Sequence, residues 1–161
     1  MVAGIALLAS CKKKENEEAK PVSKSEQLAG TNSKKWKWTG ATATVLGSSF
    51  NLFADNPSGQ KVPVCLQDDI ITFSANKSYQ TADEGSKCTP SQADQGTWAF
   101  NSGETTLTLT SGIATPGLYS GVSITIVSLT STTLQGTATV KVPLSGIATV
   151  EAPVTLTFTA Q

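Results

Sequence analysis

The sequence predicts an all-β protein that folds as an up-and-down antiparallel β-barrel of eight or nine strands. Its 161 residues include 23 threonines and 18 serines, and a composition so rich in hydroxyls is typical of β-sheet surfaces. Apolar and hydroxyl residues alternate with a period of two along much of the chain, and short polar turns separate the alternating stretches. A sheet of eight or nine strands loses its exposed edges when it closes, so a barrel is the expected arrangement.

The N-terminal residues predict a targeting signal. Residues 1–10 are apolar and end in Leu8-Ala9-Ser10-Cys11, after which three lysines follow. Ten residues rise only about 15 Å as a helix, about half the apolar thickness of a bilayer, so this stretch is too short to span a membrane. The string ending in Cys11 resembles the lipobox of bacterial lipoproteins, in which the cysteine is diacylated and the peptide before it is removed. The positively charged region that normally precedes such a stretch is missing, so the natural start is expected upstream of Met1.

Three regions are therefore expected. Residues 1–10 form the signal peptide, and residues 29–161 form the barrel domain. Residues 11–28 form a flexible charged tether, because a stretch rich in lysine and glutamate and free of aromatic residues buries too little surface to become ordered. A short turn around Ser25 to Ala29 is the one helical feature expected. The protein is expected to be anchored to the outer membrane of a bacterial cell envelope through lipid on Cys11.

A β-hairpin is expected near the middle of the chain. Ile70–Ser74 and Ser78–Thr81 are strand-like and flank Ala75-Asn76-Lys77, a short turn in which Asn76 tolerates positive φ. A two-residue loop pairs residues whose numbers sum to 153, and a three-residue loop pairs residues whose numbers sum to 152. The sequence leaves both registers open.

Cys65 and Cys88 are expected to form a disulfide. With Cys11 assigned to lipid, they are an even pair in an exported and oxidising compartment. The first register sets Cys65 opposite Cys88 and the second sets it opposite Lys87, and either register brings the sulfurs within bonding range if pairing extends that far.

The later strands are recognised by apolar residues that recur on one face. Turns are expected at 101–103, 130–132 and 145–146, at the spacing of neighbouring hairpins. The apolar faces comprise Leu107 and Leu109, then Val122, Ile124 and Ile126, then Leu134, Gly136, Ala138 and Val140, and finally Val154, Leu156 and Phe158.

The charged residues exclude several functions. The chain contains no histidine and no arginine, which removes the usual general base near neutral pH and the bidentate ligand for phosphate. Residues 38–161 carry four lysines and eight acids, a net charge of −4, so nucleic-acid binding is not expected. No nucleophile motif occurs in a suitable context, so the protein is not expected to be an enzyme or to need a cofactor.

An ordered set of short motifs resembles the lipocalin-like domain of lipoproteins from Bacteroidetes-type bacteria. The likeness covers roughly residues 28 to 135. The motifs are Trp36-Lys37-Trp38, Cys65-Leu66-Gln67-Asp68-Asp69-Ile70-Ile71-Thr72-Phe73, Asp83-Glu84-Gly85-Ser86-Lys87-Cys88, Gln95-Gly96-Thr97-Trp98 and Ile126-Val127-Ser128-Leu129-Thr130-Ser131-Thr132-Thr133-Leu134. The resemblance implies a carrier or binding module for a small hydrophobic molecule.

Two functions are compared on this basis. A barrel of eight strands has an interior wide enough either for packed side chains or for one small apolar ligand. The alternative to a carrier is a structural or adhesion module at the cell surface, with a packed barrel and no ligand. The side chains expected to line the interior are Trp36, Trp38, Phe73, Tyr79, Trp98, Leu107 and Leu109.

A small acidic cluster is a weak candidate for a metal site. Asp69 is expected to face Asp83 or Glu84 across the hairpin, where like charges are unfavourable unless they are solvated or bridged by a cation. Solvated charges are the preferred interpretation, because the spacing of a calcium-binding loop is missing, and no metal is therefore expected.

Overall fold

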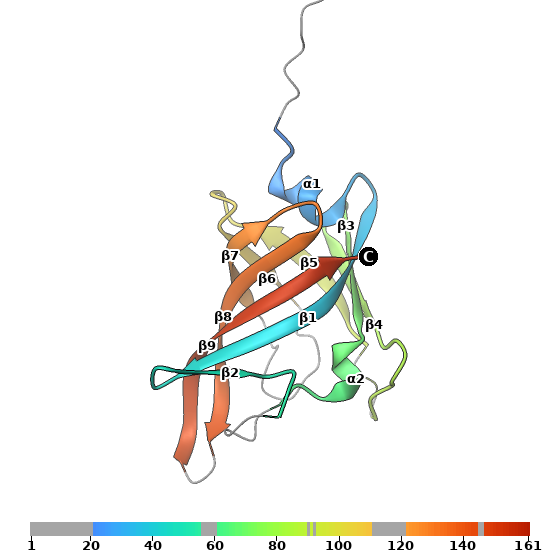
Figure 1. Cartoon of the computed structure of the whole chain (residues 1–161). Helices are drawn as coiled ribbons and strands as arrows, with labels where there is room; N and C mark the ends of the chain where they lie inside the picture. Colours follow the sequence, from blue (N-terminus) through green and yellow to red (C-terminus); the bar gives the residue numbers. More distant parts are fainter. Residues whose placement is uncertain (1–20, 56–60, 90, 92, 111–121, 145–146) are drawn as a thin grey trace, which may run out of the picture.

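A computed structural model describes residues 21–55, 61–89, 91, 93–110, 122–144 and 147–161. Its elements, in chain order, are α1 (Lys24–Ala29), β1 (Ser33–Val45), β2 (Ser48–Asn51), α2 (Val64–Gln67), β3 (Ile70–Ser74), β4 (Ser78–Ala82), β5 (Gln95–Phe100), β6 (Thr106–Leu109), β7 (Ser123–Leu129), β8 (Thr133–Leu144) and β9 (Ile147–Ala160). Figure 1 shows α1 at one end of the molecule and α2 toward the other. Within the described residues, no helix is both long and apolar enough to cross a membrane.

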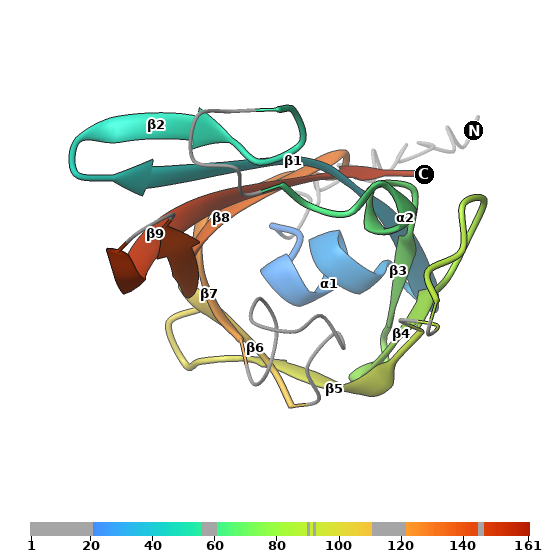
Figure 2. The ribbon, with the colours of Figure 1, turned by 90° about the horizontal axis from the view of Figure 1, so that it is seen from below.

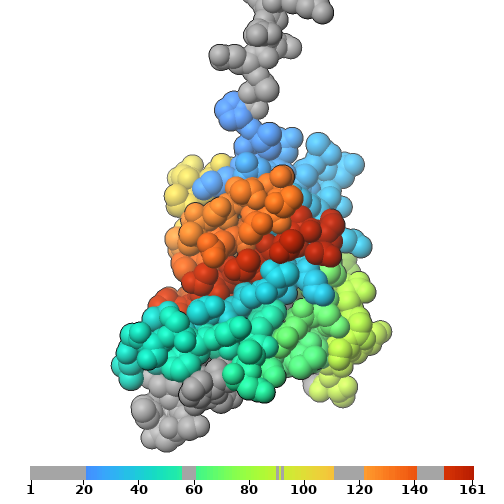
Figure 3. Space-filling model, viewed as in Figure 1, coloured from blue at the N-terminus to red at the C-terminus, as the bar shows by residue number. Residues whose placement is uncertain are grey.

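The strands form a closed antiparallel barrel. Each of β3 to β8 pairs with the next strand, β1 pairs with β3, and β9 returns to pair with β1 from Trp36↔Ala160 to Ala43↔Val154. Eight strands close the barrel, and β2 is an additional strand beside β1. The predicted all-β barrel is therefore confirmed. Figure 2 shows the resulting ring of strands, and Figure 3 shows β8, β9 and β1 as a continuous wall on the side in view.

The long strand β1 shares one of its edges between two partners. Its first half, from Ser33 to Lys37, pairs with β3, whereas its last four residues, from Thr42 to Val45, pair with β2. Its other edge belongs to β9. β2 and β3 therefore pair with different parts of β1, and the connecting segment that contains α2 runs from one to the other (Figure 2).

The β3–β4 hairpin has the second of the two predicted registers. The pairs run from Ile70↔Ala82 to Phe73↔Tyr79, so the residue numbers sum to 152 and the loop has three residues. The expectation that Asn76 takes the positive φ is wrong, because Lys77 does so, with φ of 71°. The Asn76 carboxamide instead accepts hydrogen bonds from the Ser78 N–H (3.0 Å) and hydroxyl (2.7 Å), which holds the turn together.

The predicted disulfide joins Cys65 to Cys88, with their Cα atoms 5.1 Å apart. Strand pairing ends at Ile70↔Ala82, so neither cysteine belongs to the ladder. The disulfide thus connects α2 to the chain beyond β4, in a region that the backbone hydrogen bonds of the β3–β4 ladder do not reach.

The expected tether ends earlier than predicted. Lys24 to Leu28 belong to α1, and Leu28 and Ala29 are buried against the barrel. Composition alone indicated a solvated segment, but these two apolar residues at the end of the helix find a partner surface in the barrel. The short turn expected at 25–29 is confirmed as this helix. Residues 1–20, which include the predicted signal peptide and Cys11, lie outside the described residues, as does the turn at 145–146.

Candidate functional site

One end of the barrel is closed by α1 (Figure 2). The helix begins after Ser23, whose hydroxyl accepts a hydrogen bond from the Glu26 N–H at 3.2 Å. Lysine contacts join the helix to the surrounding loops. Lys24 Nζ donates to Glu104 O (2.7 Å), Lys34 Nζ donates to Gln27 O (2.9 Å) and to Ser131 O, and Lys77 Nζ donates to Ser25 Oγ (2.9 Å).

The half of the interior next to α1 is filled by aromatic side chains. Phe73 contacts Trp98 edge to face with ring centroids 6.0 Å apart, and it lies 6.3 Å from Tyr79. Each indole N–H donates to a backbone carbonyl, namely Trp36 to Leu28 (2.7 Å), Trp38 to Gly40 (2.9 Å) and Trp98 to Ser74 (3.1 Å). Because their polar atoms are satisfied inside the protein, these tryptophans serve as packing residues.

All of the side chains predicted to line the interior are buried. Each is at most 5% exposed, in agreement with the predicted inward direction of their strand faces. Their contact with a ligand stays a prediction. They are Trp36, Trp38, Phe73, Tyr79, Trp98, Leu107 and Leu109.

The inward-facing side chains of β1, β8 and β9 become smaller away from α1. Along β1 the inward residues change from tryptophan to alanine, and along β9 and β8 they change from phenylalanine and leucine to valine and alanine. The register places Ala43 and Ala138 on either side of Val154, so the small residues of the three strands adjoin. This alanine-lined half comprises Ala41, Ala43, Ala138 and Ala152, each at most 4% exposed.

The wall formed by β3 and β4, which adjoins β1, changes from aromatic to acidic in the same direction. Phe73, Ile71 and Asp69 follow each other at every second residue and are 2%, 5% and 7% exposed. On β4, Tyr79 and Thr81 are the buried alternate residues, and the partly buried Asp83 follows the strand. The wall therefore ends, away from α1, in the buried Asp69 with the carboxyl group of Asp83 near it.

Asp69 is a buried carboxyl group with an incomplete set of partners. Its Oδ1 has no hydrogen-bond partner within the described residues, whereas the Glu84 N–H donates to the carboxylate. Burial, and next the negative charge of Asp83, raise the pKa of Asp69 to about 6. Asp83 and Glu84 were both predicted as possible neighbours of Asp69, and the observed register, in which residue numbers sum to 152, favours Asp83. The burial of Asp69 follows the period of two that runs from Phe73 through Ile71.

The chain from 83 to 88 is fixed beside this carboxyl group. The Ser86 N–H donates to Asp68 Oδ2 at 2.8 Å, and the Cys88 N–H donates to Asp83 Oδ1 at 3.2 Å. Gly85 has φ of 45°, and a Cβ at that position would lie 2.3 Å from Asp68 Oδ2, so a larger residue does not fit. Together with the disulfide, these contacts hold the acidic wall in place.

Asp69, Asp83 and Glu84 do not converge as metal ligands. Among the described residues, no group of three or more cysteine, aspartate or glutamate side chains could hold a metal ion. The structure thus brings Asp69 and Asp83 to one wall without assembling the weak candidate site.

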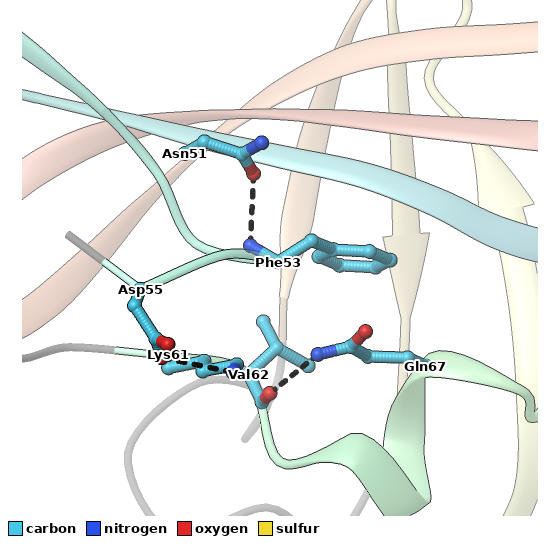
Figure 4. A network of polar contacts seen from close by, with 6 residues as sticks. All are labelled: Asn51, Phe53, Asp55, Lys61, Val62 and Gln67. Carbon is cyan, nitrogen blue, oxygen red and sulfur yellow. Dashed lines mark hydrogen bonds and ion pairs between the residues drawn. The ribbon is translucent and has the colours of Figure 1, made fainter.

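The segment between β2 and β3 lies against the alanine-lined half. Leu52, Val62 and Leu66 of this segment are buried, and Phe53 contacts the Trp38 ring edge to face at 5.1 Å. Figure 4 shows the polar contacts that shape the segment. The Phe53 N–H donates to Asn51 Oδ1 (2.9 Å), Lys61 pairs with Asp55 (2.9 Å), and Gln67 Nε2 donates to Val62 O (2.8 Å).

A second feature lies on the outside of the barrel. A groove of about 370 Å³ crosses the outer faces of β3, β4 and β5. Its lining has hydroxyl and amide groups but no charged side chain, and the sequence analysis did not predict it. The lining residues are Thr72, Ser74, Ser78, Tyr79, Gln80, Gln95, Gly96 and Thr97.

The fold and the interior define a small antiparallel β-barrel protein with an apolar centre, closed at one end by a helix. The family model of the lipocalin-like domain matches residues 29–136, and the chain belongs to this family. The match begins at the last residue of α1 and includes the disulfide, the acidic wall and the aromatic half. The predicted lipocalin-like character is therefore confirmed. No curated protein matches the chain.

Proposed function

We propose that this protein binds a small hydrophobic molecule inside the barrel, in the alanine-lined half. A lipocalin-like barrel fits a small-molecule binding module. The observation that carries the proposal is the change in side-chain size along β1, β8 and β9. Aromatic residues with satisfied polar atoms are buried in the half next to α1, whereas the smallest inward-facing side chains, the alanines, line the other half.

A titration with a neutral hydrophobic fluorophore, N-phenyl-1-naphthylamine, tests this function. The full chain with Cys11→Ser is used, so that no acyl chain can occupy the barrel. We expect one saturable site and quenching of tryptophan fluorescence, because Trp38 lies next to the alanine-lined half. A fluorescence signal that rises linearly and does not saturate at protein concentrations up to about 100 μM contradicts a binding function. Such a signal means that the dissociation constant is higher than the usual micromolar range.

The proposal includes a lipid anchor at Cys11 in the outer membrane of a bacterial cell envelope. Cys11 lies 13 residues before Lys24 in the sequence, so an acylated Cys11 ties the α1 end of the barrel to the lipid surface. Lys24, Lys34, Lys35 and Lys77 gather near this end, and positive charge favours an anionic lipid surface. The alanine-lined half then faces away from the membrane.

Mass spectrometry of the protein from its native host tests the anchor. We expect a chain that begins at Cys11 and carries acyl groups, and we expect the Cys11→Ser variant to move to the water-soluble fraction. A free thiol at position 11 in the mature native protein contradicts the anchor and leaves the binding function in place.

The outer groove favours a second candidate function, that of a surface module. Thr72, Ser74, Gln80 and Gln95 line the groove, and their side chains make no hydrogen bond within the described part of the chain. These groups are available to a polar partner at the cell surface. A partner that is captured by the wild type and lost in Gln80→Ala, together with an absence of fluorophore binding, favours this alternative.

A further inference from the structure

We infer that the molecule bound in the barrel is an amphiphile with a cationic head group, and that this head group pairs with Asp69 while the apolar tail lies in the alanine-lined half. This inference rests on the proposed function and adds the chemical class of the ligand. It depends on the position of Asp69, on its missing partner and on the charges around it.

Asp69 stands where the inner wall of the barrel changes from apolar to acidic. It follows Phe73 and Ile71 on the inward face of the chain that forms β3. Ile71 pairs with Trp36 of β1, so the wall that carries Asp69 directly adjoins the apolar inner face of β1. A ligand with its head at Asp69 can therefore place its tail against apolar side chains.

The missing partner of Asp69 points to a ligand. Asp69 as a residue is 7% exposed and its Oδ1 atom is buried, yet Oδ1 has no hydrogen-bond partner within the described residues, and none of the lysines described there pairs with it. A buried carboxylate without a counter-ion is unfavourable, and proteins normally pair such groups. With a pKa of about 6, Asp69 is mostly ionised at neutral pH, so a bound cation would relieve this penalty.

The surrounding charges select the sign of the head group. Asp68, Asp83 and Glu84 each add to the negative potential at Asp69. Lys61 is exposed and already pairs with Asp55, and Lys87 is exposed. A carboxylate or phosphate head group would therefore meet repulsion from several acids, whereas an ammonium group would meet attraction.

Displacement of N-phenyl-1-naphthylamine by three ligands of equal chain length tests the inference. The ligands are n-decylammonium, n-decanol and n-decanoate at pH 7.5 on the full chain with Cys11→Ser. The two ionic ligands are used below their micelle concentrations and decanol is used below its solubility limit. We expect decylammonium to displace the fluorophore at a concentration at least about tenfold lower than decanoate, with decanol between them, because a close, partly buried charge pair typically contributes a factor of this size.

Two variants separate the role of Asp69 from that of overall charge. Asp69→Asn keeps the shape of the side chain and removes its charge, so we expect the preference for decylammonium over decanoate to fall to about threefold or less. Asp55→Asn makes the same chemical change at an exposed position, and we expect the preference to remain. The urea midpoint of each variant shows whether it is folded.

The outcomes distinguish the inference from the proposed function. If all three ligands displace the fluorophore equally, or if Asp55→Asn reduces the preference as much as Asp69→Asn does, the head-group assignment is wrong and the binding function stands. A stronger displacement by decanoate also refutes the assignment. If the fluorophore does not bind at all, both the function and the inference fail.

Discussion

The substitution Ala138→Leu tests whether the two halves of the barrel differ in free space. Ala138 lies on β8, faces the interior of the barrel beside Val154 and is 4% exposed. Leucine adds three carbons, which contribute up to about 2 kcal/mol to stability where room exists and cost about 1–3 kcal/mol where it does not. We expect an unfolding free energy equal to or above that of the wild type, and an affinity for the fluorophore at least about tenfold lower.

Two control variants place extra carbons at other buried positions. Ala29→Leu makes the same change under α1, where the side chain is 1% exposed. Gly136→Ala adds a Cβ that would lie 2.4 Å from Ile124 Cγ2, two residues before Ala138 on β8. Both are expected to lower the unfolding free energy by about 1–3 kcal/mol in urea denaturation. If Ala138→Leu is destabilised as strongly as Ala29→Leu and still binds the fluorophore, the two halves are equally packed and the reasoning is refuted.

Three further predictions concern stability. Because the pKa of Asp69 is raised from 3.8 to about 6, its protonation stabilises the fold below pH 4 and this contribution is lost as the pH rises through 6. Asp69→Asn should therefore be more stable than the wild type by on the order of 2 kcal/mol at pH 7.5, and no more stable at pH 3.5. If the difference in unfolding free energy between the variant and the wild type, measured in urea, is the same at both pH values, the burial argument is contradicted. Replacing both Cys65 and Cys88 by alanine should cost about 3 kcal/mol, because a loop of 23 residues is released in the unfolded chain; a loss under about 1 kcal/mol would contradict this. Trp36→Phe leaves the Leu28 carbonyl unpaired under α1 and should cost about 2 kcal/mol in urea denaturation, whereas an unchanged midpoint would show that the contact does not hold the helix.

The barrel could be predicted because its strands carry a strict period of two. Val154, Leu156 and Phe158 are all buried, and the threonines between them are only partly so, as the alternation in the sequence requires. The turns at 101–103 and 130–132 also lie where the polar residues indicated, between β5 and β6 and between β7 and β8. Strand alternation and turn residues involve only neighbouring positions, so they can be read from the sequence.

Other features depend on contacts that the sequence does not show. The register of the β3–β4 hairpin depends on whether its loop has two residues or three. The three-residue loop is stabilised by the left-handed conformation of Lys77 and the side-chain hydrogen bonds of Asn76. The helix α1 contains six residues, too few to be stable alone, and it is ordered by the barrel end into which Leu28 and Ala29 pack.

The candidate site was predicted in part. The aromatic lining followed from the inward strand faces, but the role of those residues as packing depends on carbonyl partners such as Leu28 and Ser74, which come from distant parts of the chain. The alanine-lined half was missed because alanine carries no signal of its own. Its significance becomes clear only when the register places Ala43 and Ala138 around Val154.

The most direct test of the account observes the alanine methyl groups themselves. In the protein labelled with 13C at alanine methyls, addition of N-phenyl-1-naphthylamine is expected to shift the signals of Ala41, Ala43, Ala138 and Ala152, while the exposed Ala75 and Ala99 keep theirs. Shifts confined to exposed alanines, or no shift at saturating ligand, would show that nothing enters this half of the barrel and would contradict the proposed function.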